Sequence, residues 1–200
     1  MKNNLVYLIL SGLILLAGGC KDDSSTQGDI HFRNQEYALA IAAYDDYLSL
    51  KPNNIKTLYN RGRSYEELGE FDKALEDYNR VLEINPDNIN ANLSIGKDFY
   101  RKNIFDNAAF YFDKVIKVDG NNAIAHFFKG RSLHKSGVIK EALNEYNLAL
   151  NINKDYGEAY LYRGALHLYL KKRSQACSDF KLAKSLNVKE ADEALSKYCR

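Results

Sequence analysis

Residues 55–88, with the sequence IKTLYNRGRSYEELGEFDKALEDYNRVLEINPDN, carry the pattern on which the rest of the chain is built. Between residues 28 and 180, steps of 34 residues from Gly62 always reach a glycine, and the same steps from Ala74 always reach an alanine. A third column, through Tyr78, is always aromatic. The columns are Gly28, Gly62, Gly96, Gly130 and Gly164; Ala40, Ala74, Ala108, Ala142 and Ala176; and Tyr44, Tyr78, Phe112, Tyr146 and Phe180. Columns that share one phase predict a repeat array.

Each unit reads as two amphipathic helices. Within residues 55–68, Leu58, Gly62 and Tyr65 are spaced i, i+4 and i+7, which places them on one helical face. Residues 71–84 show the same kind of spacing, at Ala74, Leu75, Tyr78, Val81 and Leu82. The all-α class therefore follows from periodicity alone.

The breaks between the helices have their own signals. Gly69 can adopt the left-handed conformation that ends a helix, and Pro86 cannot continue the hydrogen-bond ladder of the second helix. Gly62 is expected to face Ala74, so that the two backbones approach closely. One helix pair cannot cover its own apolar face, so neighbouring units must stack into a curved superhelix with a concave and a convex side.

The unit resembles the tetratricopeptide repeat through Gly62, Ala74, Tyr78 and Pro86. Leu58 stands where that family has tryptophan, and the closing proline occurs only as Pro52 and Pro86. The resemblance implies a right-handed α-α superhelix of about five helix pairs. It also implies a non-catalytic scaffold that binds a protein partner in its concave groove.

The 34-residue spacing of the columns sets the boundaries of the repeat units. The array covers residues 29–190, in units of about 21–54, 55–88, 89–122, 123–156 and 157–190, called units one to five below. Residues 191–200 carry an apolar stripe expected to cap unit five. Residues 20–28 read as a polar tether. In unit one, either residues 22–27 extend the opening helix or that helix frays.

Residues 1–19 differ from the rest. Lys2 precedes an apolar run, and Ala17, Gly18 and Gly19 lead to Cys20, as in a secretory leader. This ending resembles a bacterial lipoprotein signal peptide, which implies lipidation of Cys20 by palmitate-type chains and an anchor in the outer membrane of a Gram-negative envelope. An ordinary secretory leader with an incidental cysteine is the alternative.

The residues after Cys20 leave the side of the membrane open. Lys21, Asp22 and Asp23 are similar to a short signal that sends some outer-membrane lipoproteins to the cell surface. The other interpretation is a plain solvated tether. The protein is therefore expected to be lipid-anchored and either surface-exposed or periplasm-facing.

With Cys20 lipidated, two cysteines remain. Cys177 opens the second helix of unit five, and Cys199 lies near the end of the capping helix that packs on it. In an oxidising compartment, this even pair predicts a disulfide between Cys177 and Cys199. Two buried thiols are the alternative.

Composition and motifs argue against an enzyme. The formal net charge of +2 supplies no field that would attract nucleic acid. The sequence has no zinc-protease helix, phosphate-binding loop, nucleophile elbow or Cys-x-x-Cys pair. His126 and His134 share one helix without a third ligand, and His31 and His167 fit half-buried positions. No catalytic residue, cofactor or metal site is predicted.

A partner site is predicted on the concave face, where each first helix presents a stripe opposite its core residues. Three cations share one place in successive units, and aromatic residues accompany them. The predicted partner-binding residues are Tyr59, Arg63, Lys97, Tyr100, Phe127, Arg131, His134 and Tyr162. The expected partner is an extended, acidic and partly aromatic segment. Alternatively, the cations only solubilise the groove by pairing with Glu66, Glu67 or Asp98. A narrower function, docking of an envelope-assembly lipoprotein on an outer-membrane machine, also remains open.

Overall fold

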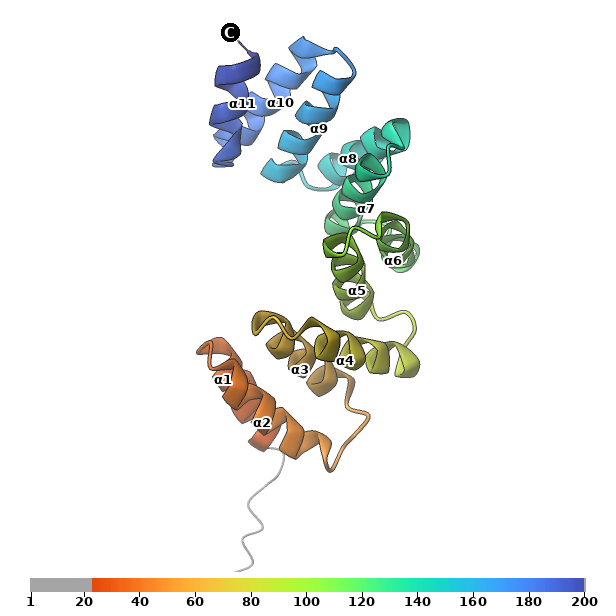
Figure 1. Cartoon of the computed structure of the whole chain (residues 1–200), viewed down its shortest axis with the longest axis vertical. Coiled ribbons are helices and arrows are strands. Elements are labelled where there is room, and N and C mark those ends of the chain that lie inside the picture. Colours follow the sequence, from red (N-terminus) through yellow and green to blue (C-terminus); the bar gives the residue numbers. More distant parts are fainter. Residues whose placement is uncertain (1–22, 200) are drawn as a thin grey trace, which may run out of the picture.

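The structure, a computed structural model, describes residues 23–199, and this part of the chain contains eleven α-helices (Figure 1). They are α1 (Asp23–Arg33), α2 (Tyr37–Leu48), α3 (Ile55–Glu67), α4 (Phe71–Ile84), α5 (Ile89–Arg101), α6 (Phe105–Val118), α7 (Ala123–Lys135), α8 (Ile139–Ile152), α9 (Gly157–Tyr169), α10 (Arg173–Ser185) and α11 (Glu190–Tyr198).

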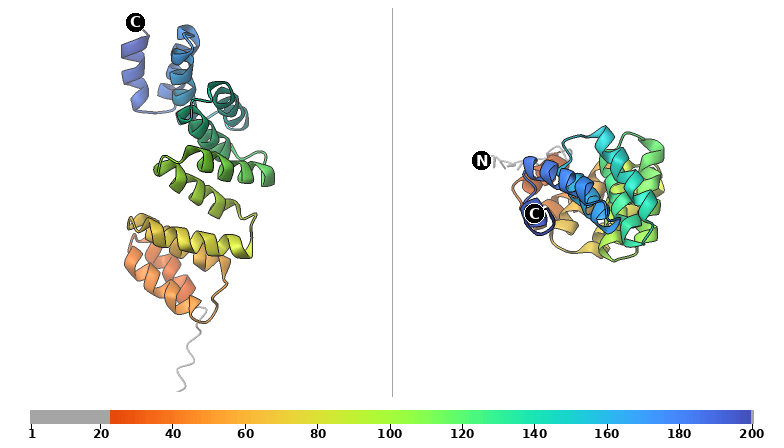
Figure 2. Two further views of the ribbon diagram at one scale, coloured as in Figure 1. Left: turned by 45° about the vertical axis from the view of Figure 1, so that its right-hand side comes forward. Right: turned by 90° about the horizontal axis from the view of Figure 1, so that it is seen from above.

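The helices pack in consecutive pairs, and each pair also contacts the next, so the predicted all-α superhelix is confirmed (Figures 1 and 2). The core is continuous between units: Leu48 of α2, Leu58 of α3 and Ile95 of α5 belong to one buried cluster. Each unit thus buries its apolar surface against its neighbours.

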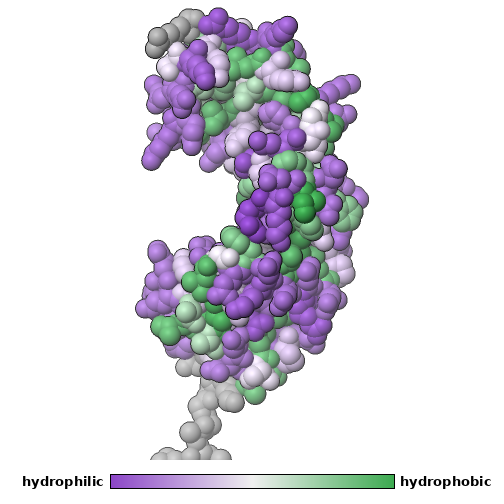
Figure 3. Space-filling view, in the orientation of Figure 1, coloured by the Kyte–Doolittle hydropathy of each residue, from purple (hydrophilic) through white to green (hydrophobic). Residues whose placement is uncertain are grey.

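Contacts also join first helices to one another, α1 with α3, α5 with α7 and α7 with α9, and we call the side of the array on which they lie the first-helix face. The molecule is hollowed on one side at the level of α5 and α7 (Figures 1 and 3). The groove predicted from the sequence corresponds to this first-helix face.

Left-handed residues end the first helices at one repeated position. Gly69 has φ 76°, as predicted, and Gly137 has φ 80°. Three residues without the freedom of glycine adopt φ 60–64° in the same column: Gln35, Asn103 and Lys171. The column of helix ends is therefore preserved even where its glycine is not.

Asparagines begin three first helices. The side chains of Asn54, Asn88 and Asn122 accept hydrogen bonds from the backbone N–H groups of Thr57, Ala91 and Ala125 at 2.9–3.0 Å. Tyr156 occupies this position in unit five and makes no such bond. These three asparagines are thus helix N-caps.

The glycine column serves a different contact from the one expected. A Cβ atom at Gly62 would lie 2.7 Å from the Tyr78 ring, whereas Ala74 is not among the nearest groups. At Gly164 the expected neighbour does contribute, because the Ala176 carbonyl oxygen would lie 3.2 Å away. Each glycine therefore admits the aromatic ring of the second helix against the backbone of the first.

The two ends of the array differ from one another. At the N-terminal end, residues 23–28, which the sequence left either to a polar tether or to an extended opening helix, belong to α1. Two contacts hold this segment. The Ser25 hydroxyl lies 3.2 Å from that of Thr57, and Gly28 packs against Tyr44. This polar stretch gave no helix signal in the sequence, because the residues that stabilise it lie on later helices.

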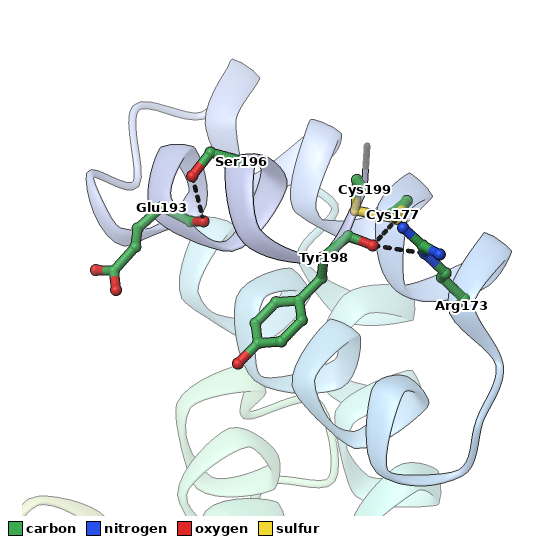
Figure 4. The surroundings of a disulfide bond; sticks show 6 residues. All are labelled: Arg173, Cys177, Glu193, Ser196, Tyr198 and Cys199. Carbon is green, nitrogen blue, oxygen red and sulfur yellow. Dashed lines mark hydrogen bonds between the residues drawn. A yellow bond between two sulfur atoms is a disulfide. The ribbon is translucent and has the colours of Figure 1, made fainter.

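At the C-terminal end, α11 packs on α10. The structure joins Cys177 to Cys199 by a disulfide with Cα atoms 5.6 Å apart (Figure 4). Arg173 of α10 donates a hydrogen bond from Nε to the Tyr198 carbonyl oxygen at 2.6 Å. The last helix is therefore held to unit five by covalent and polar contacts.

Candidate partner-binding groove

Arg63, Lys97 and Arg131 occupy the same place on α3, α5 and α7, and each lies over an aromatic ring. The Arg63 guanidinium is 4.4 Å from the centre of the Phe32 ring, and the Lys97 ammonium is 5.2 Å from that of Phe128. A cation over a ring face is attracted by the quadrupole of the ring. We call these three residues the groove cations.

Arg131 has the densest aromatic surroundings. Its guanidinium carbon lies 4.6 Å from the ring centres of both Tyr100 and Tyr162, which come from the preceding and the following first helix. The rings of Phe127 and Phe128 lie at 5.5 Å and 5.4 Å. Arg131 therefore bridges three units on the first-helix face.

The acidic residues near the groove cations are engaged elsewhere. Glu66 accepts a hydrogen bond from the Tyr78 hydroxyl at 2.7 Å, and Asp98 pairs with Arg101 and Lys102 at 2.6 Å and 3.0 Å. Within residues 23–199, none of the groove cations forms a salt bridge. The pairing with Glu66, Glu67 or Asp98 that the sequence left open is absent from this part of the chain.

The column of groove cations ends at unit one, where Asp29 occupies the place that Arg63 has in unit two. Its carboxylate accepts hydrogen bonds from Lys56 at 2.7 Å, Tyr44 at 2.8 Å and Asn60 at 2.9 Å. Burial alone would raise the pKa of Asp29, but these bonds outweigh it and lower the pKa below 3.8. In unit five the place belongs to the exposed Ala165. The groove is therefore cationic only along units two to four.

Three other predicted site residues differ in how far they are exposed. Phe127 was expected on the groove surface, but it is only 3% exposed, so a partner cannot use it as a contact. Its ring is covered by Tyr156, the residue before α9, and by Tyr162 of α9, at 4.6 Å and 5.6 Å between ring centres. Tyr59 is half-buried against Tyr78, and His134 is half-buried near Tyr146.

A hollow with an empty volume of about 500 Å³ opens beside Lys97, between α3, α4 and α5. Its floor is apolar, formed by Phe71, Leu75 and Tyr78, and charged side chains stand around it. Such a hollow can accept an apolar side chain of a partner.

A second column of cations lies two residues earlier on the first helices, and it was not predicted from the sequence. Arg61 binds both carboxylate oxygens of Asp77 at 2.5–2.8 Å and reaches Asp45 of the preceding unit at 2.6 Å. The same arrangement recurs in two later units. Lys129 bonds to Glu145 and Asp113, and Arg163 bonds to Asp179 and Asn147. Pairing with Asp77, which outweighs the effect of burial, raises the pKa of Arg61.

This column could have been found in the sequence. Cation and acid are 16 residues apart in three units, and Ile95 with Tyr111 replaces the pair in unit three. We call Arg61, Lys129 and Arg163 the spine cations, because each links its own second helix to that of the preceding unit.

Three of the four histidines have a polar neighbour. The His126 ring nitrogens lie 2.6 Å from Glu145 and 3.2 Å from the Gly120 carbonyl oxygen. His31 bonds to Glu36 at 2.7 Å, and His167 lies 3.7 Å from Asp179. Over the described range, residues that could ligate a metal do not gather in groups of three or more.

The predicted lipidation site, Cys20, and the leader before it lie outside the described residues. From Asp23 to Cys199, every helix is too short or too polar to span a bilayer.

Three sequence regions match tetratricopeptide repeat profiles: residues 26–54, 55–88 and 93–158. No curated protein matches the chain at a significant level.

Solved structures share the fold. MamA residues 41 to the end from Desulfovibrio magneticus RS-1 superpose with a TM-score of 0.76 at 14% identity, over 84% of this chain and 94% of that one. A further MamA crystal structure gives 0.74 at 22% identity, over 88% and 96%. PilW, described as a widely conserved type IV pilus biogenesis factor, gives 0.74 at 25% identity, over 83% and 77%.

Proposed function

The chain belongs to the tetratricopeptide repeat family, and from this premise we propose that it is a non-catalytic scaffold whose groove binds one segment of a partner protein. The segment is extended, acidic and partly aromatic. It lies across α3, α5 and α7 and pairs with Arg63, Lys97 and Arg131.

One observation carries this proposal: the groove cations lie on the first-helix face over aromatic rings and have no acidic partner among residues 23–199. Their charge is thus uncompensated by nearby carboxylates, which suits a ligand that supplies its own. A strand rises about 3.3 Å per residue, and packed helices lie about 10 Å apart, so roughly every third residue of the ligand should be acidic.

The expected affinity is modest. Exposed ion pairs contribute about 0.2–1 kcal/mol each, so three supply about 1–3 kcal/mol, and aromatic contacts must provide the rest. Binding in the micromolar range that weakens with added salt is therefore expected.

The test is crosslinked capture from native envelopes with the triple reversal Arg63→Glu, Lys97→Glu and Arg131→Glu. The matched control reverses Lys140, Lys154 and Lys181, three exposed lysines outside the first-helix face, and changes the net charge by the same amount. Loss of the captured protein with the groove triple alone supports the proposal. Equal capture by both triples, with helical content intact, rejects the groove.

An envelope location is part of the proposal. Two features support it: the predicted leader that precedes Cys20, and the similarity to PilW, which is named as a pilus biogenesis factor. The lipid anchor predicts that the N-terminal peptide of the mature protein begins at an acylated Cys20, which mass spectrometry can detect. Protease treatment of intact cells then distinguishes a surface-exposed from a periplasm-facing array.

A second candidate function is envelope assembly, in which the array docks on an outer-membrane machine. The PilW similarity favours it, and it requires a stoichiometric integral-membrane partner. Co-purification from solubilised membranes tests that requirement, because a captured partner without membrane spans or a barrel would count against this function.

We further propose that the bridge between Cys177 and Cys199 forms in the exported protein. Closing a loop of this length stabilises by about 3 kcal/mol in the chain-entropy account. Two thiols open to alkylation in the denatured, unreduced protein would contradict it.

A further inference from the structure

Units one and two share a hydrogen bond that unit four lacks. In unit two the buried Tyr78 hydroxyl donates to Glu66 at 2.7 Å, and in unit one Tyr44 donates to Asp29 at 2.8 Å. Each bond joins a tyrosine of the second helix to a carboxylate of the first helix. The internal carboxylate thus satisfies a donor that would otherwise be buried alone.

Unit four has the tyrosine but no carboxylate. Tyr146 is 0% exposed, and its hydroxyl has no hydrogen-bond partner among residues 23–199. His134 occupies the place of Glu66, with its ring centre 6.4 Å from that of Tyr146. A buried hydroxyl without a partner is costly, so the missing acceptor needs an explanation.

A second unsatisfied donor lies beside it. The Nε atom of Arg131 is buried and also lacks a partner in this part of the chain. Arg131 and Tyr146 share their neighbours, because both lie against Phe127 and Tyr162. Two donors and one positive charge are therefore gathered in an aromatic surrounding, without an acceptor.

We propose that unit four holds a carboxylate-binding site, in which a ligand carboxylate pairs with Arg131 and accepts a hydrogen bond from the Tyr146 hydroxyl, as Glu66 does from the Tyr78 hydroxyl. This inference rests on the proposed function and deepens it, since it identifies the anchor of the bound segment. Residues next to the carboxylate in the ligand are aromatic, because Tyr100 and Tyr162 flank Arg131 at 4.6 Å. The carboxylate comes from an acidic side chain or from a chain terminus.

The test uses three peptides and the full-length protein in detergent. The first is acetyl-Ser-Phe-Glu-Phe-Ser-amide, the second has glutamine in place of glutamate, and the third is acetyl-Ser-Phe-Ser-Phe with a free carboxyl terminus. Dissociation constants are measured by NMR titration at low salt. The glutamate peptide should bind about tenfold more tightly than the glutamine peptide, as expected for a hydrogen-bonded charge.

Three variants locate the effect. Arg131→Gln should reduce the glutamate preference to near unity. His134→Glu should do the same, because it restores the internal carboxylate found in unit two. Lys154→Gln is the control at an exposed lysine outside the first-helix face, and it should keep the preference.

Each outcome decides a point. Equal Kd values for the charged peptides and the glutamine peptide in the wild type would overturn the site, as would a preference that survives Arg131→Gln. A preference shown only by the free-terminus peptide, and lost in Arg131→Gln, would support the site and identify a chain end as the source. If the peptides show no preference while envelope capture still depends on the groove triple, the site fails and the proposed function stands.

Discussion

On α3 and α7 a spine cation and a groove cation lie two residues apart, yet their surroundings are opposite. Arg61 bonds to Asp77 and Asp45, whereas Arg63 lies over the ring of Phe32 and has no carboxylate partner within residues 23–199. Arg163 likewise binds Asp179. The difference teaches that position on the helix, not charge, separates residues that hold the array together from residues free to bind a ligand.

The largest effect should come from breaking the spine. Arg61→Ile leaves the carboxylate of Asp77, 4% exposed, without its partner, which should lower the free energy of unfolding by about 3 kcal/mol. Urea unfolding measures the loss.

The chain supplies the control for this variant, because unit three has Ile95 and Tyr111 at the same two places. The double variant Arg61→Ile, Asp77→Tyr should recover most of the lost stability, since well-packed apolar residues can replace a buried pair. A double variant as unstable as the single one would show that the pair does more than fill its site.

Substitution of a groove cation should lower the free energy of unfolding much less. Arg63→Gln removes one cation–ring contact and should cost about 1 kcal/mol or less. The same urea experiment applies, with Arg61→Ile as the comparison. Losses of equal size would remove the distinction between the two sets of cations.

The same Tyr→Phe substitution is expected to change stability differently in units two and four. Tyr78→Phe breaks the bond to Glu66 and should destabilise by about 1 kcal/mol, whereas Tyr146→Phe removes an unsatisfied hydroxyl and should be neutral or stabilising. Thermal unfolding of the two variants side by side provides the measurement. A clear loss in Tyr146→Phe would mean that its hydroxyl is already bonded.

The smallest effect concerns pH. Burial lowers the pKa of His134 in the groove and of His167 near the spine below the ordinary 6.5. Because the folded state then binds fewer protons than the unfolded state, stability is complete above about pH 6.5 and declines as the pH falls below it. The slope should be less than one proton per histidine. His134→Gln and His167→Gln should each flatten the decline between pH 7 and 5.5; unchanged slopes would contradict the lowered pKa values.

The sequence predicted the framework because its signals are local. The glycine, alanine and aromatic columns gave the helix pairs, and Gly69 marked its helix end correctly. At the same helix ends, Gln35 in unit one and Lys171 in unit five carry no such signal, and Asn103 in unit three carries a weaker one than glycine. In these units stacking against neighbours, rather than propensity, determines the backbone conformation.

The groove was less predictable. Arg63, Lys97 and Arg131 could be aligned by phase, but the stacking of Arg131 between Tyr100 and Tyr162 depends on the twist between three units. The same twist brings Tyr162 of the following unit over the ring of Phe127. Spacing along one helix cannot report contacts that neighbouring helices create.

The most direct test follows the arginine Nε–H signals by NMR during a titration with an extended peptide that has glutamate at every third position and phenylalanine between. Each arginine gives its own signal, so both sets of cations are seen in one spectrum. The account predicts that Arg63 and Arg131 shift on binding, while Arg61 and Arg163 stay unchanged. Shifts confined to Arg61 and Arg163, or equal in all four, would contradict the assignment of the groove cations to ligand binding.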